Sequence, residues 1–569
     1  MRKLLAALFL FGSVALSGEA PVVWCADDSV KVKPGDAPQD KNLVWDAASK
    51  TVTLGSAKNE YVAFQIVVKS SNDDLAGVTV TPEALKGQGN AEIPLGNIEL
   101  FVEHYLNVTI SSRAGGAQKD WFPGCTTGEH PTQMVPFNAD RFGAPFPVWA
   151  ARNQPVWVDI YVPENAAAGS YTGTFKVKAG DVALGDVKVA LTVWDFTLPI
   201  ETHFRSYLYT GPENLKWAHR INDIDSKPFL ILEDKYFQMA HQHRLNFHPS
   251  AGDVAKEVGQ RYAKYYDGSG FTERVGKGAG QNVINMPPEG DKEDAFKASA
   301  KRNLDVYQSK KFTGLMFGYI WDEPHSDQDF AESKKRCKWA HEAAGKVFNT
   351  FIATPQWQKY DGGDVNIFSE TSVEDIPKVL ARGDTVWAVN AGYGAGPYVD
   401  APGFGGRSIV WMNWKMNLGG WQFWDVCYWV DRQNRKHKEG KRWVPDMSFK
   451  DINEDPRLYI TDLWRDPLNF DEARKKGYPV NDSIRINGDG LLFYPGEDIG
   501  IHGPVASFAM KSLRRGAQDY EYLWLAKQKG KEAEIAPIVD SVCPAAGKWN
   551  DDPESWGKAR LKLAELLAK

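Results

Sequence analysis

The segment Thr313–His325 (TGLMFGYIWDEPH) constrains the fold more than any other part of this chain of 569 residues. It begins with an almost unbroken apolar run, which is typical of a parallel strand that is buried on both faces. The run stops at two adjacent carboxylates, Asp322 and Glu323, and Pro324 ends the strand because it has no backbone N–H to donate. We expect a helix to follow over about 327–344.

This order of buried strand, acidic pair and helix is that of an α/β barrel, in which the C-terminal ends of the strands carry the catalytic side chains. Two acids in this place also suit the start of a helix, where the macrodipole favours negative charge. The aromatic neighbours Tyr319 and Trp321 favour a catalytic role over a helix cap, because an aromatic wall of low polarity raises the pKa of a carboxylic acid towards neutrality. Asp322 and Glu323 are therefore the candidate catalytic residues.

The chain after residue 200 alternates strand-like and helix-like patterns. Its eight strand candidates are 203–209, 245–248, 283–285, 313–321, 348–353, 365–368, 385–390 and 421–428. Eight such units predict a (β/α)₈ TIM-like barrel with the acidic pair after the fourth strand. A ninth apolar run at 491–494 implies that one assignment lies outside the barrel. The Gly- and charge-rich segment 251–281 is too long for an ordinary connection, so we expect it to overhang a site.

Before residue 200 the pattern has a period of two. Alternating runs separated by turn residues cover 51–54, 61–69, 156–162, 171–177 and 187–193. They predict an N-terminal antiparallel β-sandwich. We therefore expect a signal peptide over 1–20, a β-sandwich domain over 27–200, and a catalytic barrel with C-terminal helices over 201–569. The sandwich is either a structural brace or a sugar-binding module.

The N-terminus has the pattern of a secretory signal. Arg2 and Lys3 precede an apolar stretch over 4–16, and small residues follow it. This predicts a secreted or periplasmic protein. The stretch is shorter than the roughly 20 residues of a spanning helix, so we expect no membrane span.

Charge and cysteine content exclude several classes. The net charge is −6 without a basic block or an acidic tail, so nucleic acid and anionic membranes are not expected partners. The five cysteines are scattered, which argues against a disulfide scaffold and a structural zinc site but leaves a single disulfide open. His241, His243 and His248 are close in sequence but lack a convergent carboxylate, so we predict no metal and no cofactor.

Aromatic residues make up 12% of the chain and include 21 Trp, which favours a carbohydrate ligand because aromatic faces stack on sugar rings. The candidates for the sugar platform are Tyr319, Tyr393, Trp414, Trp424 and Tyr494. Glu370, Asp425 and Asp489 also lie near predicted strand ends, where they either contact sugar hydroxyls or brace a loop.

Five segments together resemble glycoside hydrolase family 123, the β-N-acetylgalactosaminidases. They are IWDEPH (320–325), NGDGLLFYPG (487–496), SFAMKSLRRGAQDYEYLWLA (507–526), NEYVAFQIVV (59–68) and QPVWVDIYVPENAAAGSYTGTF (154–175). The resemblance covers nearly the whole mature chain. Ala509, where the family helix has a basic residue, and the tract 421–428 depart from it. We expect Arg514, Asp519, Tyr520 and Glu521 of the helix motif to be structural.

The resemblance implies a barrel behind a β-sandwich and the substrate-assisted, retaining hydrolysis of a terminal β-linked 2-acetamido sugar. N-acetylgalactosamine comes first among the sugars, and the substrate would be an oligosaccharide or a glycoconjugate. In the family scheme Asp322 orients the acetamido group and Glu323 is the general acid/base. Two alternatives remain open: a glycosidase of the same fold acting on a sugar without an acetamido group, and a non-catalytic carbohydrate-binding surface protein. The sequence leaves the oligomeric state open.

Overall fold

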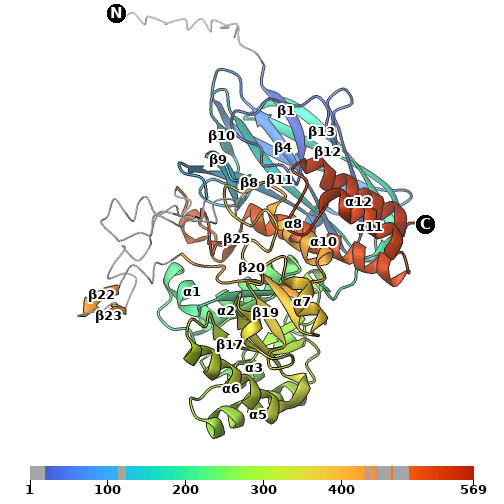
Figure 1. Ribbon diagram of the computed structural model, residues 1–569. Coiled ribbons are helices and arrows are strands. Elements are labelled where there is room, and N and C mark those ends of the chain that lie inside the picture. Colours follow the sequence, from blue (N-terminus) through green and yellow to red (C-terminus); the bar gives the residue numbers. More distant parts are fainter. Residues whose placement is uncertain are drawn as a thin grey trace, which may run out of the picture.

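The computed structural model describes residues 20–112, 124–250, 252–429, 463–465 and 486–569, and the backbone alone of 436–439 and 442–445. The expected signal peptide lies almost entirely outside these residues. A β-sandwich stacks on a parallel barrel, and the last helices lie along their junction (Figure 1). All five cysteines are free thiols. None of the described helices combines the length and apolarity that crossing a bilayer requires.

The N-terminal part is a sandwich of two sheets. One has the strand order β1–β4–β11–β8–β9. The other has β10–β5–β12–β13–β3–β2, with β6 paired to β12 and β7 paired to β6. Neighbouring strands are antiparallel except β13 and β3, which are parallel. The strands are β1 Val22–Asp27, β2 Trp45–Asp46, β3 Thr51–Lys58, β4 Glu60–Lys69, β5 Leu75–Pro82, β6 Leu85–Lys86, β7 Glu92–Ile93, β8 Ile98–Val108, β9 Gly128–Pro136, β10 Phe146–Val148, β11 Asn153–Val162, β12 Gly169–Ala179 and β13 Val182–Thr197. The period-two runs predicted β3, β4, β11, β12 and β13, whereas the other strands of the sandwich were not predicted.

The second part is a nearly closed barrel of eight parallel strands in the order β15–β14–β21–β20–β19–β18–β17–β16. The strands are β14 Ser206–Thr210, β15 Phe247–Pro249, β16 Val283–Asn285, β17 Leu315–Asp322, β18 Asn349–Ala353, β19 Ile367–Ser369, β20 Thr385–Val389 and β21 Gly420–Phe423. Across the seam between β15 and β16, the Asn246 amide donates to Asn282 Oδ1 at 2.7 Å. All eight predicted barrel strands are present. The ninth run forms β24 (Phe493–Pro495), which pairs with β25 (Pro504–Ala506) outside the barrel.

Helices cover the barrel and close the chain. They are α1 Pro212–Ala218, α2 Lys227–Gln242, α3 Val254–Gly259, α4 Ala263–Tyr266, α5 Glu293–Ser309, α6 Asp327–Ala344, α7 Ile376–Ala381, α8 Gly405–Lys415, α10 Phe508–Gln528, α11 Glu532–Val542 and α12 Pro553–Leu567. The predicted helix after the acidic pair is α6, and Ser326 caps it by accepting from Asp329 N at 3.1 Å.

The connection between β15 and β16 differs from its prediction. Its described residues form α3, α4 and turns that pack against α2 instead of overhanging a site. The Tyr265 ring stacks on Phe237 of α2 with centroids 3.6 Å apart, and Phe271 is buried beside it. Burial of its aromatic residues holds this segment against α2.

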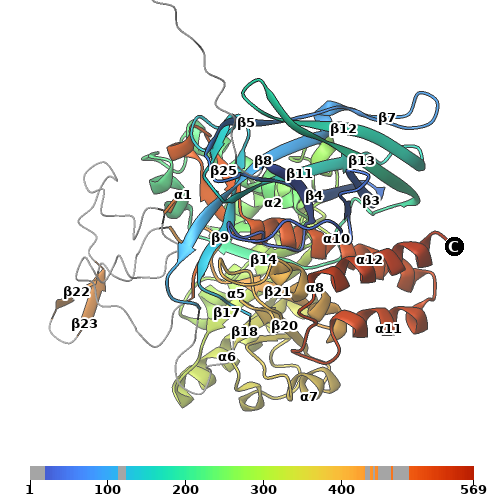
Figure 2. The same ribbon diagram turned by 90° about the horizontal axis from the view of Figure 1, so that it is seen from above.

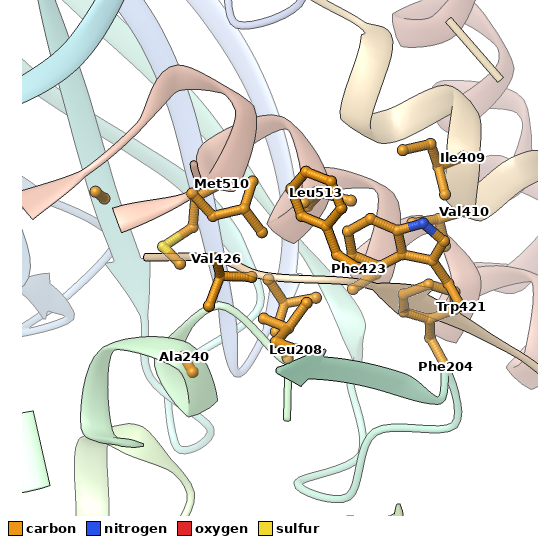
Figure 3. Packing of buried hydrophobic residues seen from close by; sticks show 14 of the residues in the cluster. Phe204, Leu208, Ala240, Ile409, Val410, Trp421, Phe423, Val426, Met510 and Leu513 are labelled. Carbon is orange, nitrogen blue, oxygen red and sulfur yellow. The ribbon is translucent and has the colours of Figure 1, made fainter. Parts of the chain in front are cut away.

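Helix α10 joins the two parts. Met510 and Leu513 lie on its apolar side and face Phe423 and Val426 at the end of the last barrel strand (Figure 3). Its opposite side meets the sandwich, as the view from above also indicates (Figure 2). There Lys511 Nζ lies 2.7 Å from Asp159 Oδ2. The contact between α10 and the sandwich is a network of five buried charged side chains: Asp159, Lys511, Arg514, Arg515 and Glu60.

The charged residues of the α10 motif are structural, as the sequence predicted. Asp519 accepts from Arg407 Nε at 2.5 Å and from Trp411 Nε1 at 2.7 Å, both on α8. Glu521 accepts from the backbone N–H of His203 at 2.7 Å, just before the first barrel strand. These contacts fix α10 against the barrel, and the contacts of Lys511 and Arg514 with Asp159 fix it against the sandwich.

We predict that Asp159→Asn lowers the free energy of unfolding by about 3–5 kcal/mol, because it leaves the buried cations of Lys511 and Arg514 without their counter-charge. Urea denaturation measures the change. The matched control is Asp195→Asn, which removes an ion pair with Lys58 and should change the free energy of unfolding far less, because the Asp195 side chain is 81% exposed. Equal losses in the two variants would contradict a structural role for the buried network.

Candidate active site

The acidic pair lies at the C-terminal edge of the barrel, at the end of β17. Asp322 is the last residue of the strand, and the backbone N–H of Glu323 donates to Ala353 O at 3.0 Å. Successive side chains of a regular strand point to opposite faces. Glu323 breaks this alternation because its φ of 42° lies in the left-handed region, which is rare for a residue with a side chain. Such strained backbone at a strand end is often associated with function.

Asp322 is held by a neighbouring phenol. The Tyr319 hydroxyl donates to Asp322 Oδ1 at 2.8 Å, and its ring stacks on Phe351 with centroids 4.7 Å apart. Burial, together with the charge of Asp322, raises the pKa of Tyr319, so its hydroxyl remains a donor throughout the physiological range. This bond fixes the direction of the Asp322 carboxylate.

The described residues do not form the expected aromatic wall around the acidic pair. Both carboxylates are exposed, and the Glu323 side chain is 56% exposed with His325 Nε2 at 3.7 Å from its Oε2. The aromatic rings pack sideways instead, and Trp321 contacts the Arg336 guanidinium at 5.7 Å. The side chains that precede the pair along the strand therefore do not shield it from water in the free protein.

A third carboxylate faces the pair. Asp322, Ala353 and Ser369 are register partners across β17, β18 and β19, so Glu370 follows β19 as Glu323 follows β17. Glu370 also has a left-handed backbone, with φ 62°. Its burial, with the charges of Glu323 and Asp322, raises its pKa to about 7. The sequence marked Glu370 only as near a strand end, and its equivalent position after a neighbouring strand is the signal that identifies it.

The interior of the barrel becomes polar just below the acidic pair. A deeper layer is apolar and aromatic and contains Tyr207, Phe317, Phe351, Ile367 and Trp387. Two residues further along their strands, Tyr319 and Ser369 follow on the same face. His248 and Gln422 also face inward because they are register partners of Tyr209 and Tyr207 on β14.

This polar floor has unused hydrogen-bonding capacity. Three of its buried atoms have no hydrogen-bond partner among the described residues: His248 Nε2, Ser369 Oγ and Gln422 Oε1. Burial lowers the pKa of His248 to about 3, so its ring is neutral. Because buried polar atoms are rarely left without a partner, a ligand rich in hydroxyl groups fits this floor. Sequence reasoning missed Ser369 and Gln422 and considered His248 only as a metal ligand, since a lone polar residue in an apolar strand gives no strong signal of sugar binding.

Three of the predicted aromatic residues lie at the C-terminal edge of the barrel. Tyr319 contacts Asp322 directly. Tyr393 follows β20 and lies beside Glu370, whose charge contributes to its raised pKa. Trp424 follows β21 and donates from Nε1 to Asp489 Oδ1 at 3.0 Å. All three rings are partly exposed.

The other two aromatic candidates lie elsewhere. Trp414 is in the last turn of α8, and because barrel helices run antiparallel to their strands, it lies at the opposite end of the barrel from Asp322. There it contacts the Tyr520 ring at 5.1 Å. Tyr494 is 1% exposed, so protein atoms cover both faces of its ring. Neither residue is placed to stack on a sugar bound at the acidic pair.

The three histidines considered as a metal cluster have separate partners. His241 stacks on Phe271 at 3.6 Å, whereas His243 Nδ1 contacts the Met239 carbonyl oxygen and His248 Nδ1 contacts the Tyr266 hydroxyl. Packing or a local hydrogen bond therefore accounts for the position of each ring.

Comparison with known proteins agrees with this architecture. Residues 39–179 match the model of the glycoside hydrolase 123 N-terminal domain. The structure of a family 123 glycoside hydrolase from Clostridium perfringens, described for the hydrolysis of glycolipid glycans, is similar over 96% of this chain and 98% of that chain, with a TM-score of 0.64 and 12% identity. The resemblance to glycoside hydrolase family 123 is confirmed. What this chain shares with the Clostridium protein at such low identity is the family 123 fold.

Two further solved structures match with much lower TM-scores. A GH2 β-galacturonidase from Eisenbergiella tayi has a TM-score of 0.26 and 9% identity, covering 81% of this chain and 74% of that chain. A GH5 xyloglucanase from Bacteroides ovatus has a TM-score of 0.21 and 9% identity, covering 67% and 94%. No curated protein matches the sequence.

We predict that Glu370→Gln changes how stability depends on pH. The pKa of Glu370 is raised from 4.5 to about 7 on folding, so the stability that its proton contributes is fully present below about pH 4.5 and is lost as pH rises through 7. Between about pH 5 and pH 8 the free energy of unfolding of the wild type should fall by about 1–2 kcal/mol relative to that of the variant. This value is reduced because the Glu370 side chain is partly exposed to solvent. Urea denaturation at both pH values measures this, with exposed Glu374→Gln as the control. A difference that does not change with pH would contradict the assignment.

Proposed function

We propose that this protein is an exported glycoside hydrolase that removes a terminal β-linked 2-acetamido sugar, N-acetylgalactosamine first, with retention of configuration. The observation that carries the proposal is the adjacent pair Asp322 and Glu323 at the end of the fourth barrel strand, with the Tyr319 hydroxyl on Asp322. Similarity to the Clostridium family 123 structure over the whole chain supports it. Because that protein is described for glycolipid glycans, glycolipids are the first natural substrates to test. The charged and apolar N-terminus supports export.

In the proposed reaction the acetamido carbonyl oxygen attacks the anomeric carbon. Asp322, oriented by Tyr319, accepts a hydrogen bond from the acetamido N–H and stabilises the positive charge that develops on the ring formed. Glu323 gives its proton to the departing oxygen of the aglycone. Glu323 then takes a proton from water, whose oxygen opens the cyclic intermediate, and the acetamido group and the original protonation state are restored.

The adjacency of the two acids favours this route over double displacement by an enzyme nucleophile. A two-carboxylate retaining enzyme needs its acids on opposite sides of the anomeric carbon with about 5 Å between them, whereas substrate-assisted enzymes depart from that scheme. When the substrate supplies the nucleophile, both protein acids can lie on neighbouring residues. The left-handed backbone at Glu323 supports this, because it breaks the strand alternation that would point the two side chains apart.

Residues around the pair supply the binding surface in this proposal. The buried unpaired atoms of His248, Ser369 and Gln422 offer hydrogen bonds to sugar hydroxyls. Tyr393 and Trp424 offer partly exposed aromatic faces. Bound sugar would also cover the exposed carboxylates, and the exclusion of water strengthens their electrostatic effect on the transition state.

A panel of nitrophenyl glycosides distinguishes the proposed function from the two alternative hypotheses that the sequence left open. We expect the wild type to hydrolyse the β-N-acetylgalactosaminide best, the β-N-acetylglucosaminide less, and β-galactosides and α-glycosides not at all. Preference for β-galactoside would favour the same-fold glycosidase acting without an acetamido group. Binding of the sugars without hydrolysis of any glycoside would favour the non-catalytic carbohydrate-binding protein.

The separate roles of the two acids are tested with two leaving groups. Glu323→Gln should reduce kcat/KM for a natural disaccharide by roughly 10²–10⁴-fold, the contribution of general acid catalysis, and should affect a dinitrophenyl glycoside much less. Asp322→Asn should raise the activation free energy for both substrates similarly, by about 3–4 kcal/mol, because it removes stabilisation of the positive charge whatever the leaving group is. Circular dichroism and thermal melting control for folding.

The reverse pattern would exchange the roles of Asp322 and Glu323. If neither variant loses activity, the pair only caps the following helix and the proposed site is wrong.

A further inference from the structure

A second cluster of chemically competent side chains lies outside the acidic site, beside the end of the barrel wall. It joins His219, which follows α1, to Glu497 and His502 in the loop between β24 and β25. Glu497 Oε1 lies 2.8 Å from His219 Nδ1 and 2.6 Å from His502 Nδ1. One ligand atom from each of the three residues lies within 4.8 Å of the other two.

The ring of His219 is held as the ring of a metal ligand usually is. Its side chain is fully buried, and its Nε2 lies 2.7 Å from the hydroxyl of Tyr236 on α2. A ligating histidine almost always bonds through its other ring nitrogen to a fixed partner, which sets the orientation of the ring. The Tyr236 hydroxyl serves in either tautomer because it can donate to Nε2 or accept from it.

The remaining two ligands face solvent and can adjust. The His502 side chain is 54% exposed and that of Glu497 is 27% exposed, so water has access to the open side of the cluster. His502 lies between Gly500 and Gly503, both with positive φ, in a turn that residues with side chains rarely form. The small shift needed to bring two ring nitrogens and a carboxylate oxygen around one ion is therefore local.

The donor set selects the kind of ion. Two imidazole nitrogens and one carboxylate oxygen suit zinc, which takes three protein ligands and a water, whereas calcium and magnesium prefer oxygen ligands alone. Two cations lie nearby. Lys235 Nζ donates to the His502 carbonyl oxygen. Arg220 lies 3.8 Å from the Asp498 carboxylate, whose negative charge offsets that of the guanidinium. The negative charge of Glu497 remains to balance the ion.

We propose that His219, Glu497 and His502 form a zinc site that clips the segment after the first barrel strand to the β24–β25 loop. In the absence of metal, each ring donates from Nδ1 to the shared carboxylate oxygen, since a carboxylate only accepts. Zinc takes the place of these two protons, which move to the Nε2 atoms of the neutral rings. Asn214 on α1 also donates to Asp425 after the last barrel strand, so the clip steadies one side of the catalytic edge. The site is separate from the acidic pair and does not depend on glycosidase activity.

Zinc binding is measured on full-length protein without a purification tag, after chelator treatment and equilibrium dialysis against zinc sulfate. We expect the wild type to retain about one zinc per chain and to melt at a higher temperature with zinc than without it, because a ligand that binds the native state stabilises it. His502→Gln changes an exposed residue, so it should keep the fold of the metal-free protein and lose the bound zinc. Tyr236→Phe should weaken zinc affinity by roughly 10–100-fold, the usual effect of removing a partner of a ligand.

Asp498→Asn is the matched control, an acid in the same loop that is not a proposed ligand, and it should bind zinc as the wild type does. Cobalt substitution adds a spectroscopic readout, since d–d absorption bands of a four-coordinate site should appear in the wild type and Asp498→Asn but not in His502→Gln. A wild type without stoichiometric zinc, or equal zinc in the wild type and His502→Gln, would overturn the proposal and leave the cluster a hydrogen-bonded clasp.

Discussion

The buried charge network on helix α10 is the interaction on which the two halves of the molecule depend. Its Lys511 and Arg514 share Asp159 of the sandwich, while Met510 and Leu513 pack on the last barrel strand (Figure 3). Buried ions give little net stability compared with apolar residues, but an unmatched partner is costly, so such a network fixes one arrangement of the parts. The sandwich is thereby joined to the barrel through a helix near the C-terminal end of the chain, which only α11 and α12 follow.

With the barrel held in this way, the parallel register determines the site. Parallel strands bring their C-terminal ends to one edge, and there the row of Asp322, Ala353 and Ser369 leads to Glu323 and Glu370 one residue further on. Left-handed backbone at both glutamates turns their side chains at this edge. Among the described residues, the polar floor beneath them has buried atoms without a hydrogen-bond partner, and in our proposal this edge binds the sugar whose glycosidic bond the acids cleave.

The sequence predicted the architecture well because hydrophobic periodicity reports burial directly. The eight barrel strands, α6 and the sandwich strands β3, β4, β11, β12 and β13 all follow from local patterns. Site residues that are brought together by strands far apart in the sequence were harder to predict. Glu370 gained its importance from the register of β19, and Trp414 looked suitable until the antiparallel course of α8 placed it at the other end of the barrel. Tyr494 failed for a similar reason, since its 1% exposure comes from packing that no local pattern encodes. The histidine cluster at His219 joins segments far apart in the chain.

The central claim is that the acetamido group of the substrate, and not a protein carboxylate, is the nucleophile. A thiazoline mimic of the cyclised N-acetylgalactosamine intermediate tests it most directly, through its inhibition constant against the best substrate of the enzyme. The account predicts an inhibition constant at least about 10²-fold below KM, because the mimic resembles the species that the site stabilises. Weak inhibition by the thiazoline, together with a stable 2-fluoro-sugar adduct on Asp322 in the mass spectrum, would contradict it.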